Sequence, residues 1–199
     1  MSEKVRKPIL LIDMDGVIAN YYARFLELWT AEFPDRKVLR PDELTSMYFE
    51  ECYPEDYMVD IRRITCDIGF FETLPEIAGA SGILNKILDE GKFEPFLCST
   101  PDSSSVNHVC TSEKMRWVEG ILGKRWLKRT ILTHDKTLVA GDFLIDDKPD
   151  IKGINPTPTW EHVVFTHNYN KHLKNHRIDN WDNWAEVESL LLGHFYRNQ

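Results

Sequence analysis

Short apolar runs that alternate with helix-type segments limit what this chain can fold into more than any other feature. The first run, Pro8–Ile12, ends in acidic residues, and later runs cover residues 93–98, 130–133, 143–146 and 162–166. Mostly apolar runs of this length are typical of strands that are buried on both faces of a parallel sheet. Because helical segments separate the runs, we expect an α/β fold with a mainly parallel sheet flanked by helices.

The segments between the runs show helical spacing of apolar side chains. The first of them predicts a helix that ends before Pro34, with an apolar face of Tyr22, Phe25, Trp29 and Phe33. Residues 35–75 are irregular, and we expect short helices there. A second helix is expected near residues 83–88, before Gly91. A third would be capped by Thr111 or Ser112, carry Met115, Val118, Ile121 and Leu122, and end at Gly123. The last is expected from Asn183 through Leu192.

Composition and charge exclude several classes of protein. The chain has 199 residues, of which 42% are hydrophobic and 28% are charged, as expected of a globular protein with one domain. The longest apolar runs are too short to cross a bilayer, so we expect no membrane partner. The net charge of −8 argues against a binding face for duplex nucleic acid.

The cysteines and the amino terminus indicate a cytoplasmic protein. The four cysteines show no metal-type spacing, and we expect them to be reduced thiols. The residues before Pro8 include an acidic side chain and no apolar stretch. We therefore expect neither a secretory signal nor a transit peptide.

Polar residues of a consistent kind follow the strand-type runs. Asp13-Met14-Asp15 follows the first run, Ser99-Thr100 a second and Asp146-Asp147 a later one, and Lys136 comes shortly after the run at 130–133. Taken alone, each of these is most often a turn, capping or surface residue. Because the carboxyl ends of parallel strands meet at one edge of a sheet, we expect the four features to lie together there.

A cluster of carboxylates needs a positive charge that offsets the repulsion among its negative charges. Two carboxylates about 4 Å apart repel by roughly 4 kcal/mol at an effective dielectric near 20. Carboxylates, a carbonyl and water are the ligands that Mg²⁺ prefers. A lysine and hydroxyls suit a phosphate instead. The combination indicates Mg²⁺-dependent phosphoryl transfer to or from a carboxylate.

The order of the motifs separates two families that use such residues. Response-regulator receivers also combine aspartates, a hydroxyl, a lysine and Mg²⁺, but their acidic pair comes first and the phosphorylated aspartate later. Here Asp13 and Asp15 come first and Asp146-Asp147 follows the lysine. This order resembles the haloacid dehalogenase superfamily. Since the dehalogenases lack the second aspartate, Asp15 favours phosphatase chemistry.

Longer segments resemble one family of that superfamily, the 5′(3′)-deoxyribonucleotidases. The similarity covers both ends of the chain and nearly everything after residue 69, and it is weakest between residues 35 and 68. Its most specific part is Pro156–His162, which reads PTPTWEH. The other matching segments are Asp13–Val17, Phe96–Pro101, Ile131–Thr137, Leu144–Lys148, Phe165–Thr166, Asn170–Leu173 and Trp181–Trp184.

The resemblance implies a role for each candidate residue. Asp13 would be the nucleophile that forms an aspartyl-phosphate, and Asp15 the general acid and base. Mg²⁺ would be held by Asp13, the backbone carbonyl of Asp15 and one carboxylate of Asp146-Asp147, with Asp147 as the direct ligand in the family pattern. The phosphate would be held by Ser99, Thr100 and Lys136.

The resemblance also implies a small helical cap, at about residues 20–75, on a core of residues 1–19 and 76–199. Tyr21, Phe70 and Phe71 would line the base pocket, although simple core packing explains the two phenylalanines equally well. A homodimer is implied too. The preferred function is hydrolysis of deoxyribonucleoside monophosphates, mostly of pyrimidines. The alternatives are a phosphatase for another small phosphomonoester and a non-catalytic phosphate-binding protein.

The histidines add little to this interpretation. His134 lies where the animal enzymes carry arginine, which alters the charge beside Lys136. His162, His167, His172 and His176 are too widely spaced for a tight metal motif. We expect those four to be structural or solvated.

Overall fold

The computed structural model describes residues 6–102 and 109–197 and contains a six-stranded sheet in which neighbouring strands are parallel. Its order is β3-β2-β1-β4-β5-β6, so β1 lies between β2 and β4. The strands are β1 (Ile9–Ile12), β2 (Glu94–Ser99), β3 (Thr130–Leu132), β4 (Phe143–Asp146), β5 (Glu161–Phe165) and β6 (Arg177–Ile178).

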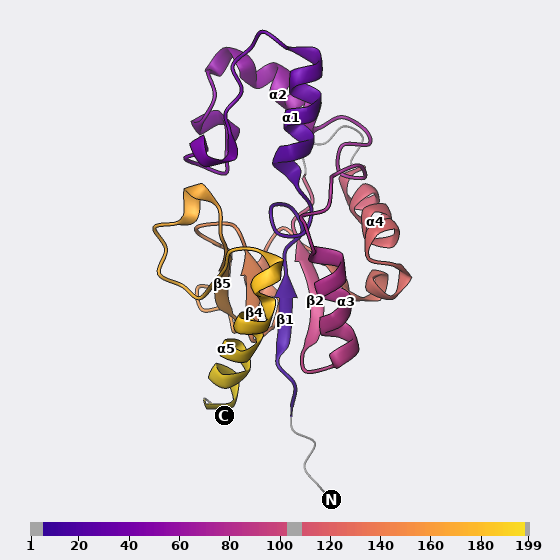
Figure 1. The fold of residues 1–199 in the computed structure, drawn as a ribbon, viewed down its shortest axis with the longest axis vertical. Coiled ribbons are helices and arrows are strands. Elements are labelled where there is room, and N and C mark those ends of the chain that lie inside the picture. The colour runs from indigo at the N-terminus through magenta and orange to yellow at the C-terminus, as the bar shows by residue number, and fades with distance from the viewer. Residues whose placement is uncertain (1–5, 103–108, 198–199) are drawn as a thin grey trace, which may run out of the picture.

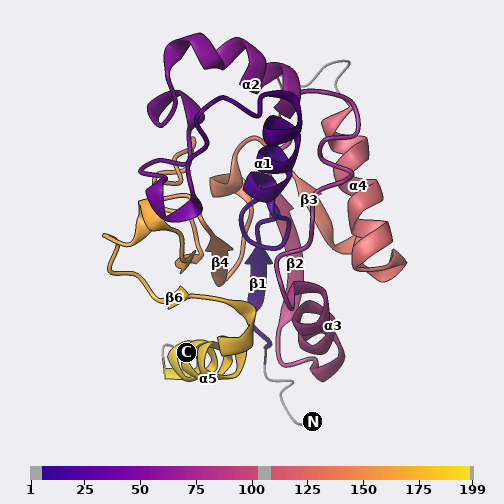
Figure 2. The ribbon, with the colours of Figure 1, turned by 45° about the horizontal axis from the view of Figure 1, so that its top comes forward.

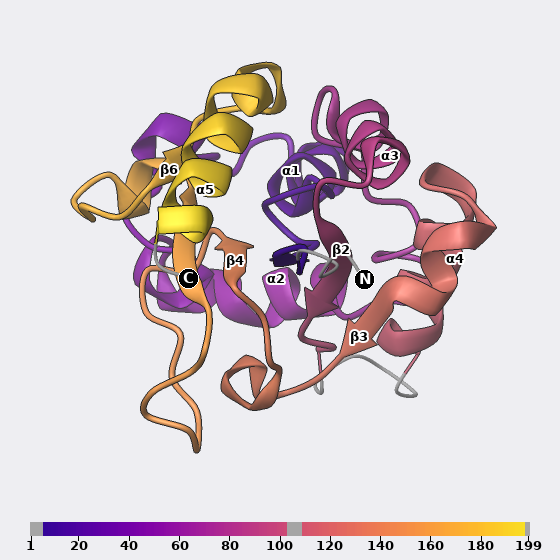
Figure 3. The ribbon, with the colours of Figure 1, turned by 90° about the horizontal axis from the view of Figure 1, so that it is seen from below.

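The α-helices of the described residues fall into two groups. Two of them, α1 (Tyr21–Glu32) and α2 (Met58–Thr65), lie beyond the carboxyl ends of the strands (Figures 1 and 2). The others, α3 (Ala80–Glu90), α4 (Cys110–Ile121) and α5 (Trp184–Arg197), lie beside the sheet. Figure 3 shows α3 and α5 on the same side of it.

Alternate residues of β1 enter two different apolar clusters, because successive side chains of a strand point to opposite faces. Leu10 and Ile12 belong to the main core, which contains the buried apolar residues of α3, α4 and α5. Leu11 belongs to a smaller cluster with Cys98, Leu144 and Trp160. Both faces of the central strands are therefore dry, as their uninterrupted apolar sequence predicted.

Aromatic residues hold the segment beyond the strand ends together. Asn20 caps α1 by accepting a hydrogen bond from the Ala23 N–H at 3.0 Å. Phe25 and Trp29 are fully buried one turn apart on α1, with their ring centroids 5.5 Å apart. Phe49, from the short 3-10 helix of residues 49–51, lies 4.4 Å from Phe25. This aromatic cluster joins an irregular stretch of sequence to a regular helix.

Most of the predicted elements are confirmed, and three details differ. The last helix, predicted through Leu192, extends to Arg197. The α4 helix begins at Cys110, so the caps predicted at Thr111 or Ser112 are wrong; the Ser112 hydroxyl instead donates to the Val109 carbonyl at 2.8 Å. The two residues of β6 were not predicted, since so short an edge strand leaves no apolar run. All four cysteines lie in the described ranges, and none of them forms a disulfide there. None of the helices in the described ranges has the length and apolar content needed to cross a membrane.

We predict that Phe25→Ala lowers the free energy of unfolding by about 3–5 kcal/mol, because it removes a buried ring and leaves a cavity. Urea denaturation measures this change. Val59→Ala is the control, since Val59 is 78% exposed on α2, and its expected change is within about 0.5 kcal/mol. Equal changes in the two variants would contradict a packed aromatic cluster.

Candidate active site

Three neighbouring strands bring the predicted polar residues together. Asp13 directly follows β1, Ser99 ends β2 and Asp146 ends β4. The Asp13 N–H donates to the Ile145 carbonyl at 2.9 Å, which extends the pairing of β1 with β4 up to the site. The site thus occupies the carboxyl edge of the sheet, where ligands of open α/β sheets bind.

Three carboxylates converge at this edge. One oxygen each from Asp13, Asp146 and Asp147 lies within 4.8 Å of the other two, and all three residues are buried. Burial raises the pKa of Asp147 well above its ordinary value, and the charges of Asp146 and Asp13 add to this effect. The cluster therefore carries more negative charge than its surroundings neutralise.

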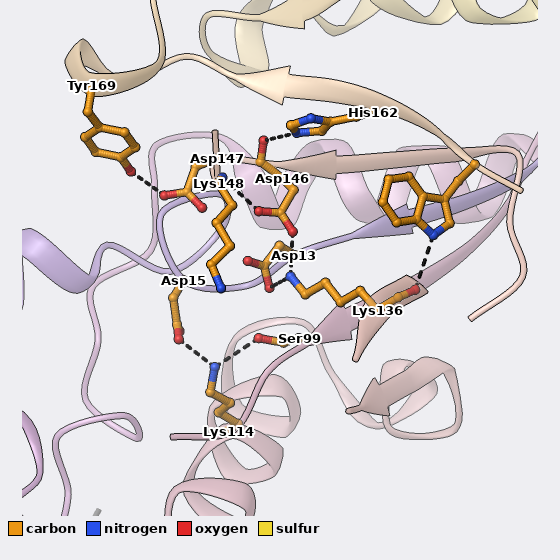
Figure 4. Close-up of polar contacts among 11 residues, drawn as sticks. Asp13, Asp15, Ser99, Lys114, Lys136, Asp146, Asp147, Lys148, His162 and Tyr169 are labelled. Atoms are coloured by element: carbon orange, nitrogen blue, oxygen red, sulfur yellow. Dashed lines mark hydrogen bonds and ion pairs between the residues drawn. The ribbon is translucent and has the colours of Figure 1, made fainter. Parts of the chain in front are cut away.

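Lys136 is the cation that contacts this cluster. It begins a one-turn 3-10 helix, η6 (Lys136–Leu138), and is 5% exposed. Its ammonium lies 2.8 Å from Asp13 Oδ1 and 2.6 Å from Asp146 Oδ2 (Figure 4). Burial lowers the pKa of Lys136, but the two carboxylates outweigh burial and raise it, so the side chain stays charged.

A second buried lysine, which sequence reasoning missed, contacts Asp15. Lys114 on α4 donates to Asp15 Oδ2 at 2.6 Å and to Ser99 Oγ at 2.9 Å (Figure 4). The buried face of α4 consists of Cys110, Glu113, Lys114, Trp117 and Val118. Ile121, one of the apolar residues that predicted this helix, is 40% exposed. In the sequence, Glu113 and Lys114 lie four and three residues before Trp117, which places them on the same helix face as this apolar residue. That spacing was the signal that charged side chains of this helix point toward a functional site.

The two aspartates of the first motif have opposite pKa shifts. Burial raises the pKa of Asp13, but Lys136 and Lys114 outweigh it and hold the pKa below its ordinary value. Burial raises the pKa of Asp15 above its ordinary value, and Lys114 offsets this only in part. Environments that push two pKa values apart assign different roles to the two groups. Asp13 is suited to be an ionised nucleophile and Asp15 a proton donor.

The residues present fit a divalent cation. Among the described residues, Lys136 is the ammonium that contacts the three carboxyl groups, so two negative charges would lack a partner if all three groups ionised. Both oxygens of Asp146 have partners, because Oδ2 meets Lys136 and Oδ1 accepts from the Lys148 N–H at 2.9 Å. Oxygen ligands in a buried acidic pocket are the donor set of Mg²⁺.

The residues around Asp147 fix its position. Tyr169 donates to Asp147 Oδ2 (Figure 4). Asn170 Nδ2 donates to the Asp147 carbonyl at 2.8 Å. Gly16 has φ of +76°, and a Cβ there would lie 2.4 Å from Asp147 Oδ2. His167 donates to the Gly16 carbonyl at 2.7 Å, so this histidine is structural, as predicted. The turn after Asp15 thus approaches Asp147 as only glycine allows.

The predicted base-pocket residues form a packed group. Phe70 and Phe71 are each 2% exposed, and Tyr21 meets the Phe70 ring edge-on at 5.1 Å. The Lys114 ammonium lies 5.3 Å from the centre of the Phe71 ring. These residues are therefore part of the packed core and also lie beside the site.

Thr100, a predicted phosphate-binding residue, lies just past the end of β2 and is partly exposed.

Glu113 joins this aromatic group to α4 and was also missed from the sequence. Its carboxylate is fully buried and accepts hydrogen bonds from the Gly69 N–H at 2.6 Å and the Phe71 N–H at 3.1 Å. Adjacent residues of α4 therefore hold the aromatic loop and Asp15 in one arrangement.

Solved structures with this architecture show which fold the chain adopts. A haloacid dehalogenase-like hydrolase from Streptococcus pneumoniae superposes with a TM-score of 0.57, 8% sequence identity, and 92% of this chain and 98% of that chain covered. One from Xanthomonas campestris superposes with a TM-score of 0.54, 11% identity, and 97% and 95% covered. The fold is that of the haloacid dehalogenase-like hydrolases.

Sequence comparisons narrow the class to a family. The family model "5′ nucleotidase, deoxy (Pyrimidine), cytosolic type C protein" matches residues 7–194. The human cytosolic 5′(3′)-deoxyribonucleotidase is 36% identical over 195 residues, covering 94% of each chain. The human mitochondrial one is 34% identical over 186 residues, covering 89% of this chain and 81% of that protein. The chain belongs to the 5′(3′)-deoxyribonucleotidase family and is a phosphoric monoester hydrolase.

We predict that Gly16→Ala weakens Mg²⁺ binding at least tenfold, because the added methyl group meets the Asp147 carboxylate and outer contacts of a metal site are worth 10–100-fold in affinity. Isothermal titration with Mg²⁺ measures this. Gly82→Ala, where a Cβ meets no atom within 4 Å, is the control and keeps the wild-type affinity. Unchanged binding in Gly16→Ala would contradict the close approach.

Proposed function

We propose that this protein is a Mg²⁺-dependent nucleotidase that hydrolyses deoxyribonucleoside monophosphates such as dUMP and dTMP, at the 5′ and also the 3′ phosphate, through an aspartyl-phosphate. The names of its relatives support the substrate class. The observation that carries the chemistry is the contrast between Asp13, whose pKa is lowered beside Lys136, and Asp15, whose pKa is raised by burial.

In the first step, an Asp13 carboxylate oxygen attacks the phosphorus. A new O–P bond forms while the bond from phosphorus to the nucleoside oxygen breaks. The Asp15 carboxyl group donates its proton to that leaving oxygen, so the nucleoside departs as an alcohol and Asp15 becomes a carboxylate. Ser99, Thr100, Lys136 and Lys114 hold the phosphate oxygens during the transfer.

In the second step, a water molecule attacks the phosphorus of the aspartyl-phosphate. Asp15 now takes the proton of that water, and the bond between phosphorus and Asp13 breaks. Inorganic phosphate leaves, with the Asp13 carboxylate and the protonated Asp15 restored. The same carboxyl group thus acts first as an acid and then as a base.

Mg²⁺ would be held by Asp13, the backbone carbonyl of Asp15 and Asp147, with Asp146 beside it. When bound, the ion neutralises the charge of the carboxylates and of the phosphate. The contact of Lys136 with Asp146 supports Asp147 as the direct ligand.

Substrate choice is assigned to the segment beyond the strand ends. We propose that residues 20–75 act as a cap on a core of residues 1–19 and 76–199, and that Tyr21, Phe70 and Phe71 read the base. Small nucleotides, and not duplex nucleic acid, are the proposed substrates. The enzyme is proposed to be a cytoplasmic homodimer.

The function is tested by phosphate release from dUMP, dTMP, UMP, dAMP and a 3′-deoxynucleotide, with Mg²⁺ or with EDTA. We expect release from the deoxypyrimidine nucleotides that requires Mg²⁺ and falls at least 1,000-fold in Asp13→Asn, since the nucleophile is removed. Cleavage of only a generic phosphomonoester by wild type would instead assign another small substrate. A wild type that cleaves nothing would contradict the catalytic proposal.

We predict that Asp15→Asn lowers kcat on dUMP by about 10²–10⁴-fold, because it removes the general acid and base. With p-nitrophenyl phosphate, whose leaving group departs as an anion without a proton from the enzyme, the variant is expected to release about one p-nitrophenolate per enzyme in a burst and then stall. Rapid-mixing absorbance measures the burst. Asp13→Asn is the control and gives none; a steady rate without a burst in Asp15→Asn would contradict the acid-and-base role.

A further inference from the structure

The connection from β4 to β5 and the first two residues of β5 contain the family-specific motif Pro156–His162, whose side chains have no part in the proposed reaction. We call residues 153–162 the strap. It lies against η6 and the end of β4, the two elements that carry Lys136 and Asp146. The contacts of the strap show what the motif does.

Two side chains of the strap hold the backbone of η6. Trp160 Nε1 donates to the Lys136 carbonyl at 3.2 Å. Asn155 Nδ2 donates to the Thr137 carbonyl, and the Asn155 N–H donates to Thr137 Oγ1, each at 3.1 Å. The Trp160 ring is 8% exposed and packs with Leu144 on the second face of the sheet. The donor to Lys136 is therefore anchored to the sheet itself.

The start of the strap is fitted against the turn before η6. Asp135 caps η6 by accepting from the Thr137 N–H at 2.9 Å, and its other oxygen accepts from the Ile154 N–H at 2.7 Å. A Cβ on Gly153 would lie only 1.9 Å from Asp135 Oδ1. The strap therefore packs so closely against the turn before η6 that no side chain fits at residue 153.

The end of the strap holds the partner of Lys136. His162 Nε2 lies 3.2 Å from the Asp146 carbonyl, which only accepts, so the ring donates (Figure 4). Both members of the buried ion pair thus receive a hydrogen bond on their backbone carbonyl from the same segment. A lysine side chain is flexible, so its ammonium is well placed only when its backbone is held.

We propose that Trp160, assisted by Asn155, is a positioning residue for the reaction: its indole N–H holds the backbone of Lys136, so that the ammonium meets Asp13 and Asp146. This inference rests on the proposed function for its effect on rate. The positioning itself is a property of the ligand-free protein.

Trp160→Phe tests the inference, because it keeps the ring and removes the N–H. A backbone hydrogen bond is worth about 0.5–1.5 kcal/mol, so we expect kcat/KM for dUMP to fall about 3–10-fold. In a Lys136→Ala background, the same substitution is expected to change the residual rate less than twofold, since residues that act through one another are not additive. Asn155→Ala is expected to give the same pattern, and Thr157→Ala, on the exposed part of the strap, is the control.

A second measurement does not depend on activity. Nitrogen-15 NMR of the lysine ammonium groups in the ligand-free protein is expected to give a slowly exchanging signal for the buried Lys136, and Lys136→Ala assigns it by removing it. We expect its hydrogen exchange to be about 3–10-fold faster in Trp160→Phe and unchanged in Thr157→Ala. Thermal unfolding verifies that each variant is folded.

The outcomes separate the two proposals. Faster exchange in Trp160→Phe with no nucleotide hydrolysis by wild type would support the positioning role and refute the proposed function. Wild-type exchange in Trp160→Phe would overturn the positioning role, as would an equal rate loss with and without Lys136.

Discussion

The buried ammonium of Lys136 between Asp13 and Asp146 is the interaction on which the rest of this structure depends. Removing one partner of a buried ion pair costs about 3–5 kcal/mol, because it leaves an uncompensated charge. The parallel pairing of β1 with β4 places the two carboxylates side by side. The short helix η6 and the strap bring the lysine to them. The fold thus maintains a cluster of charges that a core of apolar side chains would exclude.

Lys136 and Lys114 give the two aspartates of the first motif different pKa values. Lys136 and Lys114 together lower the pKa of Asp13, whereas the burial of Asp15 outweighs its contact with Lys114 and raises the pKa. Two identical side chains, two residues apart, are thereby suited to opposite tasks. The difference comes from the position of each carboxylate relative to the ammonium groups and not from its identity.

Helix α4 contacts both the loop of Phe70 and Phe71 and Asp15 of the site. Glu113 accepts hydrogen bonds from the loop of Phe70 and Phe71, while the next residue, Lys114, contacts Asp15. A movement of the aromatic loop would therefore be felt at the proposed proton donor. In the proposed mechanism, these two adjacent residues of α4 would couple the binding of a base against the rings to protonation of the leaving group.

The sequence by itself determined the strand runs, the parallel sheet and the residues at the strand ends, because apolar periodicity and backbone geometry are local properties. It also identified Asp13, Asp15, Lys136 and Asp147 as candidates, since parallel strands must end at one edge. Only the tertiary structure decided the role of Lys114, because a buried lysine is recognisable only when the face of α4 that packs inward is known. It also decided which carboxylate meets which ammonium, since distance and burial, which no spacing encodes, set the pKa of each group.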